Sequence, residues 1–339
     1  MKKLLLIGPR TNKKDPTNTG GAVVLFENLL NDLKHENISY YVIDSNKENY
    51  NNYLHAYALI SFTILVKQFK YDVISLHSSQ DYVFLSPLII IIGKLFDKTT
   101  SLRKFGGEAE QSFRNASFFY KKLLKYIFSN TDKVFLEMKS LVNFFMKINI
   151  NSFWYPNVRD RRLEPNLPRM FQKRFVFISQ VIKEKGVDEI LAASMVLDES
   201  FKIDIYGPIM DSKYSEEYLK NYNVRYLGPL LPKDVSRTLD HYDVLLLPSY
   251  KEGYPGIVIE SYAMGVPVIT TALQGLREIV VPKKTGLLVE PRNSKDLVRA
   301  MESINHRVYL EMSMNAYKKF NEFSSDVQTR LFLERLGLK

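Results

Sequence analysis

The sequence contains no cysteine among its 339 residues. Disulfides and thiolate chemistry are therefore excluded, and the composition fits a reducing compartment, so we expect a cytoplasmic protein. Long hydrophobic runs are also absent. The most apolar stretch, residues 82–96, contains Ser86, Pro87 and Lys94 and falls short of the roughly 20 apolar residues that cross a bilayer. We interpret it as a core helix.

Several motifs that identify catalytic or binding chemistry are missing as well. No group of His, Cys, Asp and Glu has metal-ligand spacing, and no Asp-x-Asp follows a predicted strand, so we expect a metal-independent protein without a cofactor. No Ser-His-Asp arrangement is legible, and no Gly-x-Gly-x-x-Gly follows the first strand, which argues against a nicotinamide enzyme. No compact basic motif with interleaved aromatic residues has a nucleic-acid-binding module's spacing, so nucleic acid is not an expected partner.

The chain carries a formal net charge of +10, which points to an anionic partner or to compositional bias. A nucleotide diphosphate and an anionic membrane are two candidates. Residues 118–128 form a basic, aromatic helix by pattern, with Lys121, Lys122 and Lys125 on one face. Docking onto anionic lipid at the inner face of the membrane, at about 1 kcal/mol per lysine, would suit an acceptor carried on a lipid. The alternative interpretation is a core helix with a solvated lysine edge.

Strand-like and helix-like segments alternate in two series along the chain. The first series starts with the apolar residues 3–7, the second starts at 175–179, and a polar stretch at 156–173 lies between them. Such alternation predicts an α/β protein with two doubly wound, parallel-sheet domains. We place a first domain at 1–160, a second at 161–310 and C-terminal helices at 311–339.

Residues 248–267 carry the strongest chemical signal. They follow an apolar strand, turn through glycines and enter an apolar-periodic helix, whose start carries roughly half a positive charge and favours phosphate. Glu252 and Glu260 flank this start, so amides that hold a diphosphate and carboxylates that accept from hydroxyls would together suit a sugar nucleotide. The alternative interpretation makes Glu252 a turn acid and Glu260 a solvated helix residue. The amides expected to face the ligand belong to Gly256, Ile257 and Val258.

The run from Glu252 to Glu260, EGYPGIVIE, and its continuation AMGVPVIT at 263–270 resemble the signature of retaining glycosyltransferases of family 4. The resemblance extends through most of residues 174–310. It implies a GT-B fold, in which two Rossmann-like domains face each other across a cleft, with the last helix crossing back to the first domain. It also implies transfer of a hexose from a nucleotide diphosphate sugar, with a UDP-sugar favoured, to a glycan or lipid-linked acceptor in bacterial surface polysaccharide synthesis.

The resemblance assigns roles on the donor side. Lys185 matches a lysine that binds the diphosphate and neutralises the leaving group, but Gln180 stands where the family has an arginine. Losing one such donor lowers the rate by a factor on the order of 10²–10³. Lys183 or Arg103 is therefore a candidate for the positive charge that the arginine supplies in the family. Glu260 would bind the ribose, and Glu252 would bind the transferred sugar near the amides of Gly253 and Gly256. The resemblance also implies that the loop containing Gly20 and Gly21 closes over the diphosphate. The loops containing Gly207 and Leu230 would line the base pocket.

The acceptor side gives a weaker signal. The family commonly has a histidine after the fourth strand of the first domain, and residues 101–108 contain none. His77, which we expect to follow the third strand and face the cleft, Arg103 and Glu108 are the candidates, and a lone histidine is more often structural. Retaining transfer in the family is usually described as same-face attack assisted by the leaving phosphate, so a missing base is tolerable. The competing hypothesis is an impaired or non-catalytic scaffold that binds nucleotide sugar.

Overall fold

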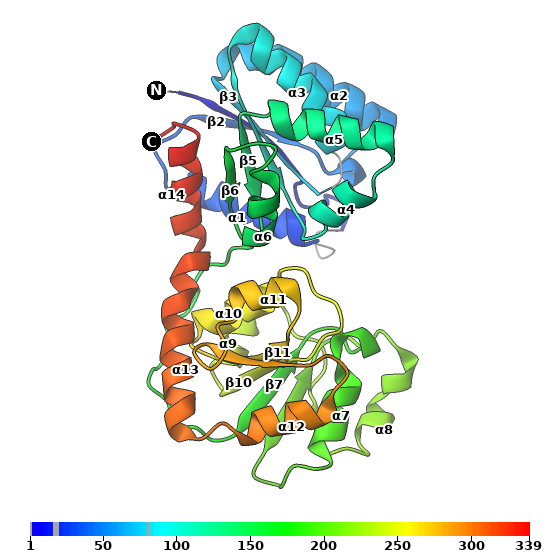
Figure 1. Cartoon of the computed structure of the whole chain (residues 1–339), viewed down its shortest axis with the longest axis vertical. Helices are drawn as coiled ribbons and strands as arrows, with labels where there is room; N and C mark the ends of the chain where they lie inside the picture. The colour runs from blue at the N-terminus through cyan, green and yellow to red at the C-terminus, as the bar shows by residue number, and fades with distance from the viewer. Residues whose placement is uncertain (1, 16–19, 80–81) are drawn as a thin grey trace. The chain divides into compact units, whose positions relative to one another are not determined.

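The computed structural model describes residues 2–15, 20–79 and 82–339, and these form two compact units (Figure 1). Unit 1 contains the chain up to Val158 together with Ser325–Lys339, and unit 2 is Arg159–Ser324. Each unit has a parallel sheet of six strands with helices packed on it. The predicted fold class, two doubly wound parallel sheets, is confirmed.

The sheet of unit 1 has the strand order β2-β1-β3-β4-β5-β6, and every neighbouring pair is parallel. Its inner strand β1 is buried along its whole length, because helices cover both faces of the sheet, and this is why the strand reads as an unbroken apolar run. The strands are β1 Leu4–Gly8, β2 Tyr40–Asp44, β3 Val73–Ser78, β4 Thr99–Lys104, β5 Lys133–Leu136 and β6 Ser152–Trp154.

The helices of unit 1 form two layers. Figure 1 draws α2, α3 and α5 on one side of the sheet and α1, α6 and α14 on the other. Short helical turns, η1 Lys47–Asn49 and η2 Gln68–Lys70, flank α2. The helices are α1 Gly21–Leu33, α2 Tyr53–Lys67, α3 Tyr82–Phe96, α4 Ala109–Asn115, α5 Phe118–Asn130, α6 Lys139–Phe145 and α14 Ser325–Arg335.

The C-terminal helix α14 packs on α1 through a buried polar contact and an aromatic cluster. The hydroxyls of Ser325 and Thr329 donate to Oδ2 of Asp32 at 2.5 and 2.8 Å. Burial raises the pKa of Asp32 above its ordinary value in spite of these two hydrogen bonds. Phe332 contributes the apolar part, with its ring centroid 4.9 Å from that of Phe135.

The sheet of unit 2 has the strand order β12-β11-β10-β7-β8-β9 and is also parallel throughout. The chain reverses its direction of growth between β7 and β10, which places the ends of these two inner strands side by side. The strands are β7 Arg174–Ile178, β8 Lys202–Tyr206, β9 Arg225–Tyr226, β10 Val244–Leu247, β11 Val268–Thr271 and β12 Gly286–Val289.

The helices of unit 2 also cover both faces of its sheet, with α7 and α12 on one side and α10 and α11 on the other (Figure 1). The helices are α7 Val187–Ser194, α8 Glu216–Leu219, α9 Val235–Leu239, α10 Gly256–Ala263, α11 Gln274–Ile279, α12 Ser294–Glu302 and α13 His306–Lys319, with the short turns η3 Lys183–Lys185, η4 Ser212–Tyr214 and η5 Phe320–Phe323. Within the described part of the chain, no helix has both the length and the apolar character to cross a membrane.

Candidate active site

Two ionisable side chains meet at the carboxyl end of the unit 2 sheet. Lys185 lies in η3, after β7, and Glu252 lies in the loop after β10. The Nζ atom of Lys185 lies 2.7 Å from Oε1 of Glu252, and the hydroxyl of Ser249 donates to the same oxygen at 2.8 Å. The two side chains are 23% and 10% exposed, so the pair is shielded but still reaches solvent. A lysine held in this way is suited to stabilise charge on a phosphate.

Close backbone contact between the two loops holds this pair together. Gly186 has a φ of +77°, and a Cβ there would lie 2.1 Å from the carbonyl oxygen of Pro248. Only glycine fits such an approach. Next to it, the N–H of Tyr250 donates to the carbonyl of Glu184 at 2.8 Å. The loop after β7 therefore lies directly on the loop after β10, which brings Lys185 to Glu252.

Helix α10 begins at Gly256, shortly after Glu252 in the sequence. Pro255 is its N-cap, and Gly256 and Ile257 occupy its first turn. The amide of Val258 donates to the carbonyl of Pro255 at 3.3 Å, so it is not free for a ligand, contrary to the prediction. Gly253 is exposed in the preceding loop.

Arg159 is a residue of this region that sequence reasoning missed. Its Nε donates to Oε1 of Glu260 at 2.5 Å, and a Cβ on Gly256 would lie 1.7 Å from its guanidinium. The guanidinium therefore lies against the first turn of α10 and adds a positive charge there. Nothing in the sequence indicated it, because it falls in the polar stretch at 156–173 between the two series of strand-like and helix-like segments.

The remaining donor-side predictions fall on neighbouring loops of unit 2. Gly207, after β8, has a φ of +139°, and a Cβ there would lie 1.7 Å from the carbonyl oxygen of Ser179, so the close approach of the two loops requires glycine. Leu230 is half-buried in the loop after β9. Gln180 and Lys183 are both exposed beside Lys185 in the sequence.

Gly20 and Gly21 open the first helix of unit 1. Gly20 is the N-cap of α1 with a φ of −74° and Gly21 is the first helical residue. A Cβ on either glycine would meet nothing within 4 Å. The backbone conformation does not require glycine at either position. The space beside the backbone is open, so a ligand has room to approach it. Residues 16–19 of the same loop lie outside the described part of the chain.

His77 does not lie where the sequence predicted. It lies within β3 rather than after it, and its side chain is fully buried. Its Nε2 lies 2.9 Å from the hydroxyl of Ser75, and its ring packs near those of Phe26 and Phe332, with centroids 5.2 and 5.5 Å away. Burial, and then the charge of Arg103, hold its pKa well below the ordinary value. The expectation that it faces a ligand is wrong, because the alternation of the strand turns it into the aromatic core.

Arg103 is also buried, which overturns its role as a source of charge for the donor. Its guanidinium carbon lies 3.4 Å from the ring centroid of Tyr155, and one of its nitrogens donates to the carbonyl of Pro156 at 3.3 Å. Burial lowers its pKa from the ordinary value. Glu108, by contrast, is exposed at the N-cap of α4, where a ligand could reach it.

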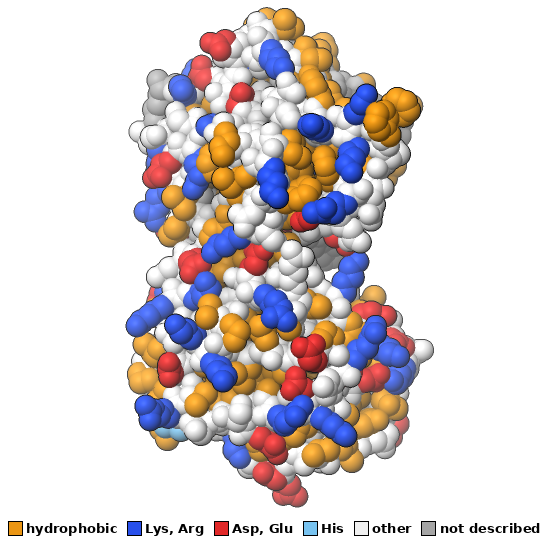
Figure 2. Space-filling view, viewed as in Figure 1, with side chains coloured by type: hydrophobic (Ala, Val, Ile, Leu, Met, Phe, Trp, Pro, Cys, Tyr) orange, Lys and Arg blue, Asp and Glu red, His pale blue; other side chains and the backbone are white. Residues whose placement is uncertain are grey.

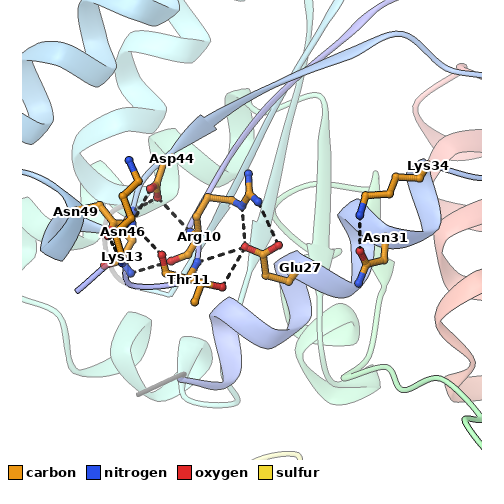
Figure 3. Close-up of polar contacts among 9 residues, drawn as sticks. All are labelled: Arg10, Thr11, Lys13, Glu27, Asn31, Lys34, Asp44, Asn46 and Asn49. Atoms are coloured by element: carbon orange, nitrogen blue, oxygen red, sulfur yellow. Dashed lines mark hydrogen bonds and ion pairs between the residues drawn. The ribbon is translucent and has the colours of Figure 1, made fainter. Parts of the chain in front are cut away.

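A polar cavity of about 360 Å³ lies at the carboxyl ends of β1 and β2 in unit 1. Figure 3 shows its ion pair, in which the Nε of Arg10 donates to Oε1 of Glu27 at 2.7 Å. The N–H of Arg10 also donates to Asp44 at 3.1 Å, and Asn49 donates to the other oxygen of Asp44 at 2.7 Å. No local sequence pattern predicts this cavity, because its residues come from the loop after β1, from α1 and from the end of β2. Its lining is Arg10, Thr11, Lys13, Glu27 and Asp44.

Comparison with known proteins identifies unit 2. Residues 159–319 match the family described as glycosyl transferases group 1, and this range is nearly the whole of the unit. Unit 2 is a glycosyl transferases group 1 domain. One curated relative of the chain is the N,N'-diacetylbacillosaminyl-diphospho-undecaprenol alpha-1,3-N-acetylgalactosaminyltransferase of Campylobacter jejuni, 26% identical over 163 residues that cover 47% of this chain and 43% of the relative.

Another curated relative is the capsular polysaccharide biosynthesis glycosyltransferase CapM of Staphylococcus aureus. It is 26% identical over 216 residues, which cover 60% of this chain and 56% of CapM. The aligned part thus spans about half the length of these curated relatives.

Solved structures resemble the chain over nearly its whole length. Anabaena HepE in complex with UDP superposes with a TM-score of 0.72 at 14% identity, covering 99% of this chain and all of that one. Sucrose-phosphate synthase from Thermosynechococcus elongatus gives a TM-score of 0.70 at 16% identity, covering 98% of each chain. At this identity the likeness shows the fold, and the group 1 domain together with unit 1 makes a GT-B fold.

Proposed function

We propose that the protein is a retaining glycosyltransferase of family 4 that transfers a hexose from a nucleotide diphosphate sugar to a glycan or lipid-linked acceptor. The observation that carries this proposal is the contact of Lys185 with Glu252 beside the first turn of α10, within a group 1 domain. A UDP-sugar is the favoured donor, since HepE was solved with UDP. The names of the relatives favour bacterial surface polysaccharide as the product.

On the donor side, the diphosphate would lie against the first turn of α10. The amides of Gly253, Gly256 and Ile257 would donate to it, and the helix start would favour its negative charge. Lys185 and Arg159 supply two fixed cations for the same purpose. Arg159 thereby offers the charge that Gln180 does not.

The carboxylates would recognise hydroxyls. Glu252 would accept from the transferred sugar and Glu260 from the ribose, with Lys185 and Arg159 holding each carboxylate in place. Other backbone groups of the loops at Gly207 and Leu230 would read the base, since the N–H of Gly207 donates to the carbonyl of Gly228 and its own carbonyl accepts from the hydroxyl of Tyr226.

In the reaction, the bond between the anomeric carbon and the diphosphate oxygen breaks, and an acceptor hydroxyl oxygen bonds to that carbon on the same face. The proton of the hydroxyl passes to the leaving phosphate oxygen, and the nucleoside diphosphate departs. Lys185 and Arg159 would stabilise the charge that develops on this oxygen, which is the role a metal ion has in other transferases. We therefore propose a metal-independent enzyme.

For the acceptor, we propose the polar cavity of unit 1. Its ionised groups Glu27, Asp44 and Arg10 offer acceptors and a donor for sugar hydroxyls. Glu108 and the glycines at the start of α1, Gly20 and Gly21, are further exposed groups at this end of unit 1.

The second candidate function is an impaired or non-catalytic scaffold that binds nucleotide sugar, and Gln180 favours it. Release of UDP from UDP-glucose and from UDP-N-acetylglucosamine, measured for the natural chain and for Gln180→Arg, distinguishes the two. Turnover by the natural chain, with little gain in the variant, supports the transferase in which Arg159 and Lys185 suffice. Turnover that appears only in Gln180→Arg supports the scaffold.

A further inference from the structure

One face of unit 1 exposes an unusual number of large apolar side chains. It is formed by α2, α3 and α5, and α3 contacts both of the others. We name it the α2/α3/α5 face. Phe84 and Phe119 are 68% and 80% exposed. Apolar side chains gathered in this way usually mark an interaction surface. The exposed apolar residues of the three helices are Tyr53, Leu54, Leu59, Phe62, Leu65, Val66, Phe84, Ile91, Leu95, Phe96, Phe118, Phe119, Tyr120 and Tyr126.

The exposed side chains form stripes rather than scattered points. On α3, Phe84, Ile91 and Leu95 recur at intervals of seven and four residues, which places them on one side of the helix. The opposite side of α3 packs on the sheet, at β3 and β4. The helix is therefore apolar on both sides, although only one of them faces the core.

The charge of this face has one sign. The sequences of α2, α3 and α5 contain no aspartate and no glutamate. Figure 2 shows hydrophobic and basic side chains interspersed over the part of unit 1 where Figure 1 draws α3 and α5. The lysines on the three helices are Lys67, Lys94, Lys121, Lys122 and Lys125.

The lysines of α5 lie directly beside apolar surface. Lys121, Lys122 and Lys125 line an apolar hollow of about 350 Å³ together with Phe118. The Nζ of Lys122 lies 4.6 Å from the ring centroid of Phe118. Aromatic rings that can enter an apolar layer are thus surrounded by cations that can meet anionic headgroups.

We propose that the α2/α3/α5 face docks on the surface of a bilayer that contains anionic phospholipid. Helices that lie in the interface combine an apolar side with lysines at its rim, as here. A protein partner is a weaker match, because interfaces between proteins are depleted in lysine. Nucleic acid is also a weaker match, because binding to its phosphates and bases does not require exposed aliphatic side chains. This proposal goes beyond the transfer reaction and does not depend on it.

Co-sedimentation with vesicles tests the proposal. The full chain should bind vesicles of phosphatidylcholine with phosphatidylglycerol far more strongly than vesicles of phosphatidylcholine alone. Each lysine near an anionic surface strengthens binding about fivefold, so Lys121→Gln/Lys122→Gln/Lys125→Gln should weaken it about a hundredfold. Phe118→Ser/Phe119→Ser should weaken binding to the same vesicles through loss of the inserted rings.

A matched control removes the same charge from unit 2. Lys202→Gln/Lys233→Gln/Lys284→Gln changes three exposed lysines there and should leave vesicle binding unchanged. Binding that falls equally in the control would overturn the proposal in favour of net charge, and so would a natural chain that binds neither kind of vesicle. Sedimentation velocity that shows self-association, abolished by Phe118→Ser/Phe119→Ser, would assign the face to a second copy instead. The change in melting temperature with UDP, measured on every variant, reports on the donor site separately.

Discussion

The carboxyl ends of the two sheets use charge in different ways. In unit 2, Lys185 and Arg159 pair with carboxylates at the edge of the sheet and keep part of their surface in solvent. In unit 1, His77 and Arg103 also lie near the carboxyl ends of their strands, β3 and β4, but both side chains are fully buried among aromatic rings. The partly exposed pairs of unit 2 can exchange a partner for a ligand, whereas Arg103 and His77 have no path to one. Charge at a strand end therefore indicates a site only where it remains accessible.

The largest expected effect comes from Lys185→Ala. If Lys185 stabilises the leaving diphosphate, UDP release by this variant should fall by roughly 10²–10³. Lys183→Ala is the matched control, since Lys183 is exposed two residues away in the same turn, and its rate should stay near that of the natural chain. A loss that is equally large in Lys183→Ala would break the distinction and assign the charge to Lys183.

Arg159→Ala should have the next largest effect. A charged hydrogen bond to a phosphate contributes about 1.5–3 kcal/mol, so the affinity for UDP should fall at least tenfold in a calorimetric titration. Arg299→Ala removes an equal charge from an exposed pair on α12 and serves as the control. Unchanged affinity in Arg159→Ala would mean that this arginine only positions Glu260.

The parallel sheets of both units follow from the alternation of strand-like and helix-like segments. The sites of the two units, however, could not be predicted equally well from the sequence. In unit 2 a continuous run, from Glu252 to Glu260, encodes a loop and a helix start together, so local sequence suffices. In unit 1 the prediction rested on three isolated residues, His77, Arg103 and Glu108, and the alternation of β3 decided that His77 faces the core. Arg159 and the cavity at Arg10 and Glu27 depend on contacts between distant segments, which no local pattern records.

His77 should make the stability of unit 1 depend on pH. The pKa of His77 in the folded state lies well below the ordinary 6.5. Below pH 6.5 the unfolded chain therefore binds a proton at this histidine that the folded chain does not bind. The stabilisation is complete above pH 6.5 and falls by about 1.4 kcal/mol per pH unit as the pH drops. Urea unfolding of His77→Leu should show a shallower loss over this range. An identical pH slope in both proteins would mean that His77 is not buried in its neutral form.

The smallest effect is expected at Asp32. Its raised pKa means that the folded state holds a proton more tightly than the unfolded one, so its contribution to stability is lost as the pH rises through the folded pKa. Asp32→Asn keeps an acceptor for Ser325 and Thr329 without the charge. It should stabilise the protein at neutral pH by no more than about 0.5 kcal/mol, because solvent screens a half-buried carboxylate. Destabilisation beyond about 1 kcal/mol at neutral pH would show that the ionised carboxylate is needed to hold α14.

The donor site is tested most directly by thermal unfolding with UDP, GDP, ADP and dTDP, for the natural chain and for Glu260→Ala. A nucleotide at about 100 times its dissociation constant should add roughly 2.7 kcal/mol of stability. We expect UDP alone to raise the melting temperature, the shift to disappear in Glu260→Ala, and Glu217→Ala, an exposed acid on α8, to keep it. No shift with any of the four nucleotides would contradict the proposal that this group 1 domain binds a nucleotide sugar.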